Sequence, residues 1–166
     1  MSFELIKRLA LLFVLCAVQI LFLNHIRLFG VATPMLYILF VIIFHRNTPK
    51  WAMLLWSFTM GLAIDVFSNT PGLAAGSMTL IAAIQPYLLE LFVPRDSIDE
   101  LRVSSSTLGI GKYITFSTIL TVIYCLVFFA LEAFSFYDWI HWLTCAGSSA
   151  LLTLILILSI ETVRKK

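Results

Sequence analysis

The chain is a succession of long apolar runs separated by short polar connections. A helix needs about 20 mostly apolar residues, rising about 1.5 Å each, to cross the hydrocarbon core of a bilayer. Six runs approach or reach that length, and the longest connection is 94–112. The predicted spans are residues 9–23, 28–44, 51–67, 73–93, 113–134 and 139–160. We therefore expect one all-α membrane domain over residues 1–166, built as a bundle of six transmembrane helices.

Composition supports a membrane protein. Hydrophobic residues make up 61% of the 166 residues and charged residues only 12%, and the mean hydropathy is +1.01. A soluble domain carries about 25% charged residues. The lipid bilayer is therefore the expected partner of most of the surface, and the net charge of +2 gives no indication of nucleic-acid binding. Cys16, Cys125 and Cys145 show no paired spacing and are expected to act as small apolar residues.

The basic residues predict the orientation of the chain. In a six-span arrangement, every Lys and Arg except Arg27 falls on one side of the membrane. The residues on that side are Lys7, Arg8, Arg46, Lys50, Arg95, Arg102, Lys112, Arg164, Lys165 and Lys166. Basic residues accumulate in cytoplasmic connections, so both termini and the 94–112 loop are expected in the cytoplasm. A cleaved signal peptide over the first run is less consistent, because no small-x-small cleavage site follows it.

One carboxylate, Asp65, lies inside the third predicted span, in the stretch GLAIDVFSNTPGL. A carboxylate costs about 2.5 to 3.5 kcal/mol at the centre of a transmembrane helix and less near an interface. Two interpretations remain open. Asp65 either faces the bundle interior as a functional residue, or it bonds to local backbone and caps the turn that follows. A role in partner contact predicts that Asp65→Asn leaves the chain folded but weakens partner binding.

The residues after Asp65 predict a tight hairpin. Pro71 and Gly72 suit the two central positions of a type II turn, and Asn69 and Thr70 precede them. Gly72 also begins a G-x-x-x-G spacing that ends at Gly76, and Gly61 stands four residues before Asp65. Small residues at this spacing let two helices approach closely. We expect them to pack the third span against the fourth within this chain rather than to form a dimer.

A second polar feature lies in the fourth span, at Gln85 and Pro86. Proline removes a backbone hydrogen bond and is expected to kink the helix, which frees a carbonyl for Gln85 or a neighbour to satisfy. In the 94–112 loop, Ser97 and Glu100 have the spacing of a helix-capping box. The loop is either a short surface helix that contacts a cytoplasmic partner or a solvated connector.

The sequence contains no recognisable catalytic constellation. The three histidines, His25, His45 and His141, lie near different span ends and have no metal-ligand spacing. No Ser-His-Asp set falls at one membrane depth, and no glycine-rich phosphate loop is present. We therefore expect neither an enzyme nor a bound cofactor or metal.

Two stretches resemble the rod shape-determining MreD family, in the form found in Bacteroidetes-type bacteria. They are QILFLNHIRLFGVATPMLYILF, residues 19–40, and GLAIDVFSNTPGLAAGSMTLIAAIQP, residues 61–86. The matching positions are Gln19, Asn24, Gly30, Pro34, Tyr37, Gly61, Asp65, Thr70, Gly72 and Pro86. The resemblance covers about the first 95 residues and departs at Gln85, where many relatives carry a basic residue.

The resemblance implies a non-enzymatic scaffold in the bacterial inner membrane. Such proteins bind the single-span protein MreC. Through MreC they connect the MreB filament to the peptidoglycan glycosyltransferase and transpeptidase of cell elongation. The family is similar in architecture to the six-helix substrate-binding subunits of energy-coupling-factor vitamin transporters, which implies an outward-facing cavity near Asp65 and the Asn69–Gly72 turn.

That similarity also supplies the alternative function, a solute-binding subunit of a vitamin transporter. In those subunits the first helix commonly carries an A-x-x-x-A docking pattern. Here Ala10 is followed four residues later by Val14, and Ala17 by Leu21. The missing pattern favours the scaffold. A proton carrier using Asp65, Glu90 and Glu132 is less consistent still, because these carboxylates lie towards both faces of the membrane rather than in one relay.

Overall fold

The computed structural model describes residues 2–23, 33–46, 48–93, 103, 105–133 and 138–164, and every regular element among them is helical. Five long helices account for most of this length. They are α1 (Ser2–Leu21), α3 (Lys50–Ser68), α4 (Leu73–Phe92), α6 (Ile110–Ala133) and α7 (Trp139–Arg164). Three short elements complete the fold: the 3₁₀ turn η2 (Leu36–Ile38), α2 (Leu39–Ile42) and α5 (Ser105–Leu108).

Four of the helices, α3, α4, α6 and α7, are long and apolar enough to cross a membrane. Their bounds agree closely with the predicted third, fourth, fifth and sixth spans. The chain is therefore an all-α membrane protein with four candidate spans among its described residues. Helix α1 is also 20 residues long, but its first two turns carry Glu4, Lys7 and Arg8, which makes this end of the helix polar.

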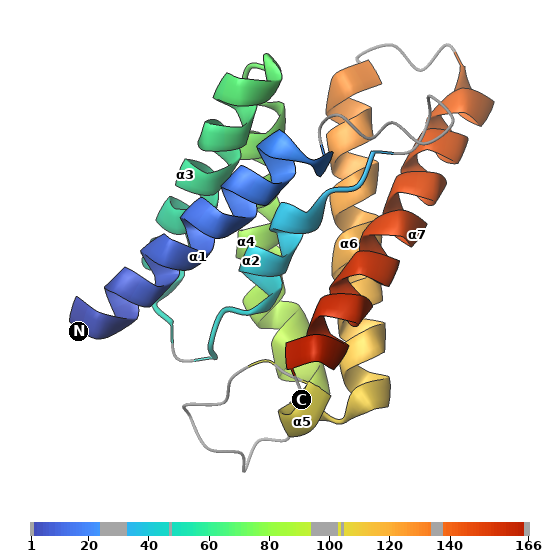
Figure 1. Cartoon of the computed structure of the whole chain (residues 1–166). Coiled ribbons are helices and arrows are strands. Elements are labelled where there is room, and N and C mark those ends of the chain that lie inside the picture. Colours follow the sequence, from blue (N-terminus) through green and yellow to red (C-terminus); the bar gives the residue numbers. More distant parts are fainter. Residues whose placement is uncertain are drawn as a thin grey trace.

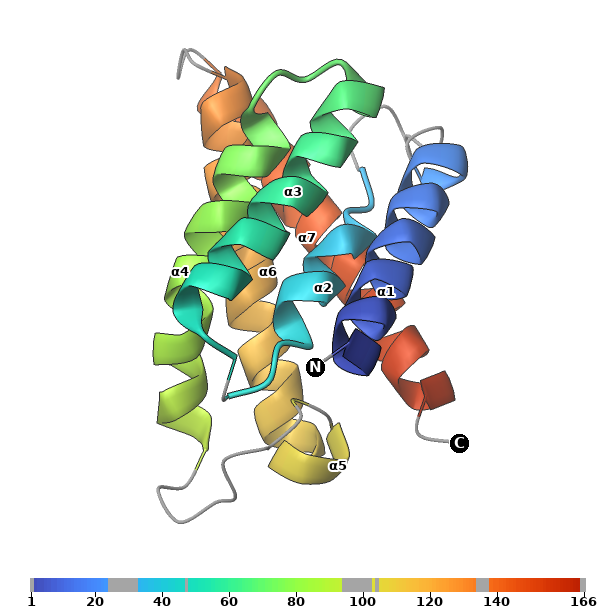
Figure 2. The ribbon, with the colours of Figure 1, turned by 90° about the vertical axis from the view of Figure 1, so that its left-hand side faces the viewer.

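The helices form a bundle with α2 at its centre (Figures 1 and 2). Helices α3 and α4 make one antiparallel hairpin and α6 and α7 make another, and the two pairs meet where α4 packs against α6. The short η2–α2 segment is enclosed by α1, α3, α4 and α7. Every residue from Met35 to Ile42 is buried, so this segment is part of the core.

The prediction of one continuous helix over 28–44 is wrong for its described part. Residues 33–35 are not helical, and only the seven residues of η2 and α2 are helical. Pro34 has no N–H to donate, and side chains replace the missing helical bonds. Gln19 Nε2 donates to the Pro34 carbonyl at 2.9 Å, and the Leu36 N–H donates to Gln19 Oε1 at 3.1 Å. Non-helical backbone at membrane depth is tolerated where protein groups satisfy it in this way.

We call residues 33–42 the broken segment. Helix α7 supplies the other two hydrogen-bond partners of this segment. The Thr33 N–H donates to Ser149 Oγ at 3.1 Å, and the Met35 N–H donates to Thr153 Oγ1 at 3.0 Å. Ser149 and Thr153 are one turn apart, so both face the same strip of backbone. The segment therefore ties α1 to α7 through hydrogen bonds to its own main chain.

Replacing Thr153 by valine tests this connection. Thr153→Val keeps the shape of the side chain but leaves the buried Met35 N–H without its acceptor, which costs about 1 to 3 kcal/mol. We expect a fall of about 2 to 12 °C in the thermal midpoint of the detergent-purified protein. Thr162→Val in the same helix is the control, because the exposed Thr162 hydroxyl bonds only to its own helix, at the Leu158 carbonyl. Equal midpoints for the two variants would contradict this role.

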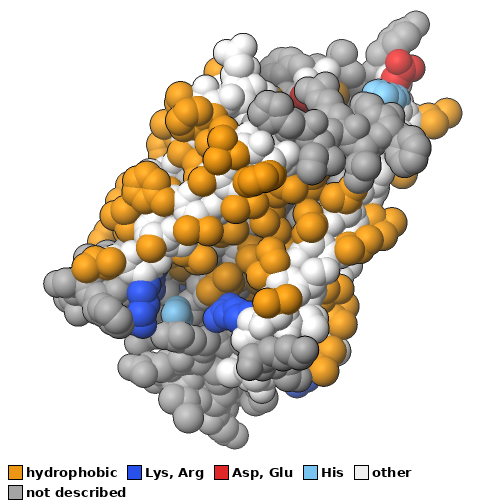
Figure 3. Space-filling view, viewed as in Figure 1, with side chains coloured by type: hydrophobic (Ala, Val, Ile, Leu, Met, Phe, Trp, Pro, Cys, Tyr) orange, Lys and Arg blue, Asp and Glu red, His pale blue; other side chains and the backbone are white. Residues whose placement is uncertain are grey.

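The charged residues divide between the two ends of the bundle (Figure 3). We call the end at which α1, α3 and α6 begin and α7 ends the basic end. All the described Lys and Arg residues lie near it: Lys7, Arg8, Arg46, Lys50, Lys112 and Arg164. A wide belt of hydrophobic side chains separates this end from the opposite one, as expected for a bilayer-embedded surface.

The predicted loop over 94–112 falls mostly outside the described residues. Its described part contains α5. Helix α6 begins at Ile110, so the loop ends before residue 112, where the sequence predicts its end. The Ser97 and Glu100 capping box lies outside the described residues.

Candidate functional site

Asp65 links the end of α3 to the start of α4. Its side chain is only 6% exposed. Oδ1 accepts hydrogen bonds from the Ala74 N–H and the Thr70 hydroxyl, and Oδ2 accepts one from the Ala75 N–H, each at 2.9 Å. The first N–H groups of a helix have no partner within the helix and attract negative charge. Asp65 therefore caps α4 from a neighbouring helix, which supports the capping interpretation of this residue.

Gly61 brings α3 close enough for this cap. A Cβ atom at this position would lie 2.5 Å from Ala75 Cα and 2.6 Å from the Ala74 carbonyl oxygen. Real Cβ atoms do not approach backbone so closely, so only glycine fits. Gly61 and Asp65 are one turn apart on the same face of α3. The glycine sets the distance between the helices and the carboxylate then reaches the α4 N-terminus.

The turn between the helices is held by left-handed residues. Asn69 ends α3 with φ 56° and ψ 38°, and the Thr70 N–H donates to the Asp65 carbonyl at 3.2 Å. Asparagine tolerates this conformation better than most residues. Gly72 has φ 81° and ψ −3°, the values of the third residue of a type II turn, and the Leu73 N–H points back to the Thr70 carbonyl at 3.4 Å. The predicted turn is confirmed at Gly72.

The predicted G-x-x-x-G contact is wrong in its position. A Cβ atom on Gly72 would meet nothing within 4 Å, and one on Gly76 would meet only the Leu131 side chain, at 3.9 Å. The close contact instead joins Gly61 to Ala74 and Ala75. Gly72 is needed for its positive φ, whereas Gly76 lies exposed.

The tip of the hairpin presents a surface of defined shape. Asn69, Pro71 and Gly72 are exposed. Val66 and Phe67, in the last turn of α3, are 69% and 66% exposed. The Asp65 bonds fix the hairpin backbone from which these exposed side chains project. We call Val66, Phe67, Asn69 and Pro71 the hairpin tip.

Gln85 and Pro86 do not form the local pair that the sequence predicts. Helix α4 continues through Pro86 to Phe92. The Gln85 side chain is buried, and its Nε2 has no hydrogen-bond partner among the described residues. The expectation that Gln85 compensates for the proline is thus not met in the part of the chain that the structure describes.

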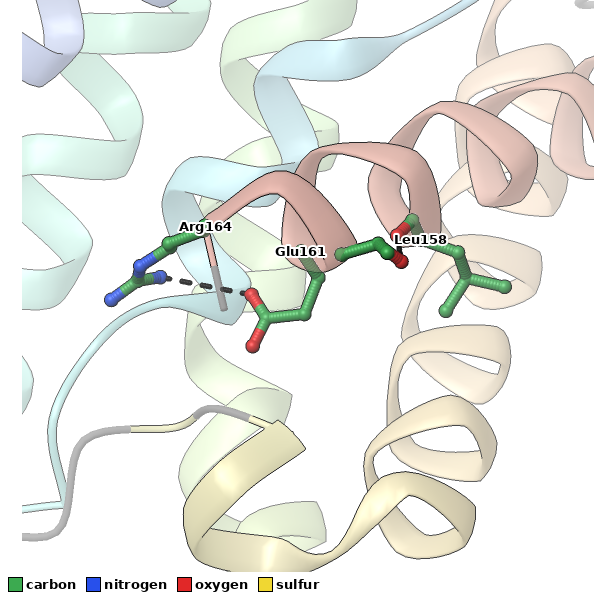
Figure 4. Close-up of polar contacts among 4 residues, drawn as sticks. Leu158, Glu161 and Arg164 are labelled. Carbon is green, nitrogen blue, oxygen red and sulfur yellow. Dashed lines mark hydrogen bonds and ion pairs between the residues drawn. The ribbon is translucent and has the colours of Figure 1, made fainter. Parts of the chain in front are cut away.

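Sequence reasoning missed a buried carboxylate at the basic end, Glu161. Its side chain is buried in the last turns of α7, and one oxygen lies 3.9 Å from Arg164 Nη1 (Figure 4). The Tyr113 side chain of α6 lies beside it. The i, i+3 spacing of the acid and the base was the available signal. The burial of Glu161 could not be predicted from the sequence. In a helix that is apolar on all sides, the residue pattern does not show which face packs inward.

The Asp65 carboxylate bonds within its own hairpin. Its oxygens are occupied by two backbone N–H groups and a hydroxyl of the same hairpin. Within the described residues, no three His, Cys, Asp or Glu side chains gather into a group that could hold a metal ion. What the site offers is a closely packed helical hairpin with an exposed tip.

Comparison with known proteins gives no match, whether with protein-family models, with curated proteins or with solved structures.

Proposed function

We propose that the chain is a non-enzymatic scaffold of the bacterial cell-elongation machinery, of the MreD kind. In this role it binds the single-span protein MreC. Through MreC it connects the MreB filament to the glycosyltransferase and transpeptidase that build peptidoglycan. The proposal rests on the resemblance of residues 19–40 and 61–86, together with the structural tasks of those residues.

The observation that carries the proposal is that the resembling positions build the fold. Gln19 and Pro34 join α1 to the broken segment, and the hydroxyl groups of Tyr37 and Tyr124 share a hydrogen bond across the core. Gly61 and Asp65 join α3 to α4. Asn24 and Gly30 lie outside the described residues. Residues with such structural roles support a scaffold, which acts by presenting a binding surface. They give no support to a catalysed reaction.

We further propose six membrane crossings with both termini in the cytoplasm. Helix α1 and the segment that ends in α2 supply the two crossings beyond the four candidate spans. The start of α1 is anchored at the basic end, where Arg8 Nη2 donates to Thr48 Oγ1 at 3.2 Å. The basic end is the cytoplasmic one under the positive-inside rule. This places the hairpin tip at the outer face of the inner membrane.

Substitutions in the hairpin tip test partner binding without disturbing the fold. Asn69→Gly keeps the left-handed backbone and removes the exposed carboxamide, and Phe67→Ala removes an exposed ring. In a pull-down of the tagged chain from its native membrane in mild detergent, we expect the double variant to recover several-fold less MreC. The thermal midpoint should stay within about 2 °C of the parent, because both side chains are largely exposed.

The matched control is Leu151→Ala, an equally exposed apolar residue at mid-helix in α7, which should retain the partner. Recovery of no MreC or elongation enzyme by the parent chain would overturn the proposed function. Full recovery by the tip variant would overturn only the location of the contact.

One observation favours the alternative, a solute-binding subunit of a vitamin transporter. Buried polar atoms without partners among the described residues, such as Gln85 Nε2 and Ser57 Oγ, are the groups that a bound solute would engage. In the same purification, a retained small molecule together with an ATPase-linked membrane partner would support this function instead.

A further inference from the structure

Helix α6 carries a row of buried hydroxyl groups along one face. Tyr113, Ser117 and Thr121 are spaced one turn apart, and each is at most 1% exposed. None of their side-chain oxygens makes a hydrogen bond of good geometry within the described residues, although the Tyr113 hydroxyl lies near Ser117 and Glu161. We call these three residues the hydroxyl track. It runs from the basic end of the bundle, where α6 begins, towards the middle.

Other hydroxyl groups of the same helix behave differently. Thr115 and Thr118, on the exposed side, donate to the carbonyls of Gly111 and Ile114 at 3.0 and 2.7 Å. This back-bonding to residue i−4 is the usual solution for Ser and Thr inside a helix. The buried Ser117 and Thr121 hydroxyls do not adopt it. Their hydrogen-bonding capacity is therefore directed into the bundle interior.

Gln85 of α4 lies at the far end of the track. The rings of Phe92 and Phe116 are 6.0 Å apart, and a Cβ on Gly76 would lie 3.9 Å from Leu131. These two contacts fix the register of the antiparallel pair α4 and α6. At an equal rise per residue, Gln85 faces the turn of α6 that holds Thr121. Its side chain is 1% exposed and its Nε2 has no partner in the described part of the chain.

At the other end, the track lies next to the charged residues of the basic end. The Tyr113 side chain lies beside Glu161, which is paired with the partly exposed Arg164 (Figure 4).

We propose that the half of the bundle nearer the basic end binds a short row of water molecules along the hydroxyl track, from Tyr113 to Gln85. Ser117 and Thr121 are separated by about 6 Å along the helix, which is the length of two hydrogen bonds with a water oxygen between them. The Tyr113 hydroxyl, which lies near Ser117, is a further partner for the first water. Each water then has at least two polar partners, as buried waters require. Leaving four buried polar groups unpaired would be a heavy cost for one bundle. This inference does not depend on the proposed function.

Radiolytic labelling in H₂¹⁸O tests for bound water directly, because X-rays convert a bound water into a hydroxyl radical that labels the nearest side chain. Applied to the full chain in detergent, it should label Tyr113 at least several-fold faster than Tyr124. Tyr124 is the matched control, since it is equally buried in the same helix but its hydroxyl is bonded to Tyr37. Equal labelling of the two tyrosines would overturn the proposal.

A second measurement separates bound water from hydroxyl groups that are simply unpaired. Thr121→Val should lower the thermal midpoint by about 2 to 4 °C if the hydroxyl binds water, whereas Thr118→Val on the exposed face should shift it less. The midpoint would rise instead if the Thr121 hydroxyl had no partner, because an apolar group of equal shape then stabilises the core. A rise would overturn the proposal. So would an organic solute that co-purifies with the parent chain but not with Thr121→Val, because the occupant would then be that solute.

Discussion

Gly61→Ala is expected to destabilise the protein by about 3 to 5 kcal/mol, which corresponds to a fall of about 6 to 20 °C in the thermal midpoint. The added Cβ would lie 2.5 Å from Ala75 Cα and 2.6 Å from the Ala74 carbonyl oxygen. Both are backbone atoms and cannot rotate away, so α3 and α4 must separate. Separation then breaks the bonds between Asp65 and the start of α4. The loss therefore exceeds that of ordinary overpacking.

Gly76→Ala is the matched control, since it makes the same change in the facing helix. Its Cβ would meet only the flexible Leu131 side chain, at 3.9 Å, and alanine favours helix more than glycine does. We expect an unchanged or slightly raised midpoint, measured by intrinsic fluorescence during heating in detergent. If Gly61→Ala were as stable as Gly76→Ala, the close approach of α3 to α4 would be wrong.

Asp65→Ala is expected to cost a similar amount, about 3 to 5 kcal/mol. It removes the acceptor of two buried N–H groups and one hydroxyl, and hydrogen bonds to a charged group contribute about 1.5 to 3 kcal/mol each. Asp65→Asn should fall between the parent and Asp65→Ala, because its amide keeps one acceptor oxygen but turns an NH₂ group towards a backbone N–H. The thermal midpoint in detergent checks this order.

Glu132→Gln is the control for Asp65, because Glu132 is an exposed carboxylate at the same end of the bundle. It should leave the midpoint unchanged. A normal midpoint for Asp65→Asn, combined with lost partner recovery, would instead support direct partner contact by this carboxylate. Since Gly61 and Asp65 act through the same helix contact, the double variant Gly61→Ala, Asp65→Ala should lose less than the sum of the single losses.

The sequence predicts the four candidate spans well because their limits are set by local signals. The Pro71 and Gly72 turn marks the end of one helix and the start of the next, and the apolar runs supply the lengths. The role of Asp65 was half predictable. Its nearness to a turn made a cap one of two open interpretations. The atoms that it caps, at Ala74 and Ala75, belong to a second helix whose distance depends on Gly61.

The broken segment was not predictable from its own residues. Residues 28–44 are apolar and long enough for a helix, and only Pro34 argued against one. What decides the outcome is the presence of Gln19, Ser149 and Thr153 around it, which replace the helical bonds. The same reasoning applies to the hydroxyl track. Serine and threonine are common in membrane helices, and the burial of these hydroxyl groups becomes visible only in three dimensions.

The partners of the broken segment also constrain how the chain matures during synthesis. The acceptors for the Thr33 and Met35 N–H groups lie 116 and 118 residues later, on α7, which leaves the ribosome after α3, α4 and α6. Until that helix arrives, these amides have no lasting bond and are costly to expose to lipid. We therefore expect the segment to remain shielded by the insertion machinery while the middle helices enter the bilayer. Chains truncated before Ser149 should be poor substrates for stable insertion and preferred targets of membrane proteases.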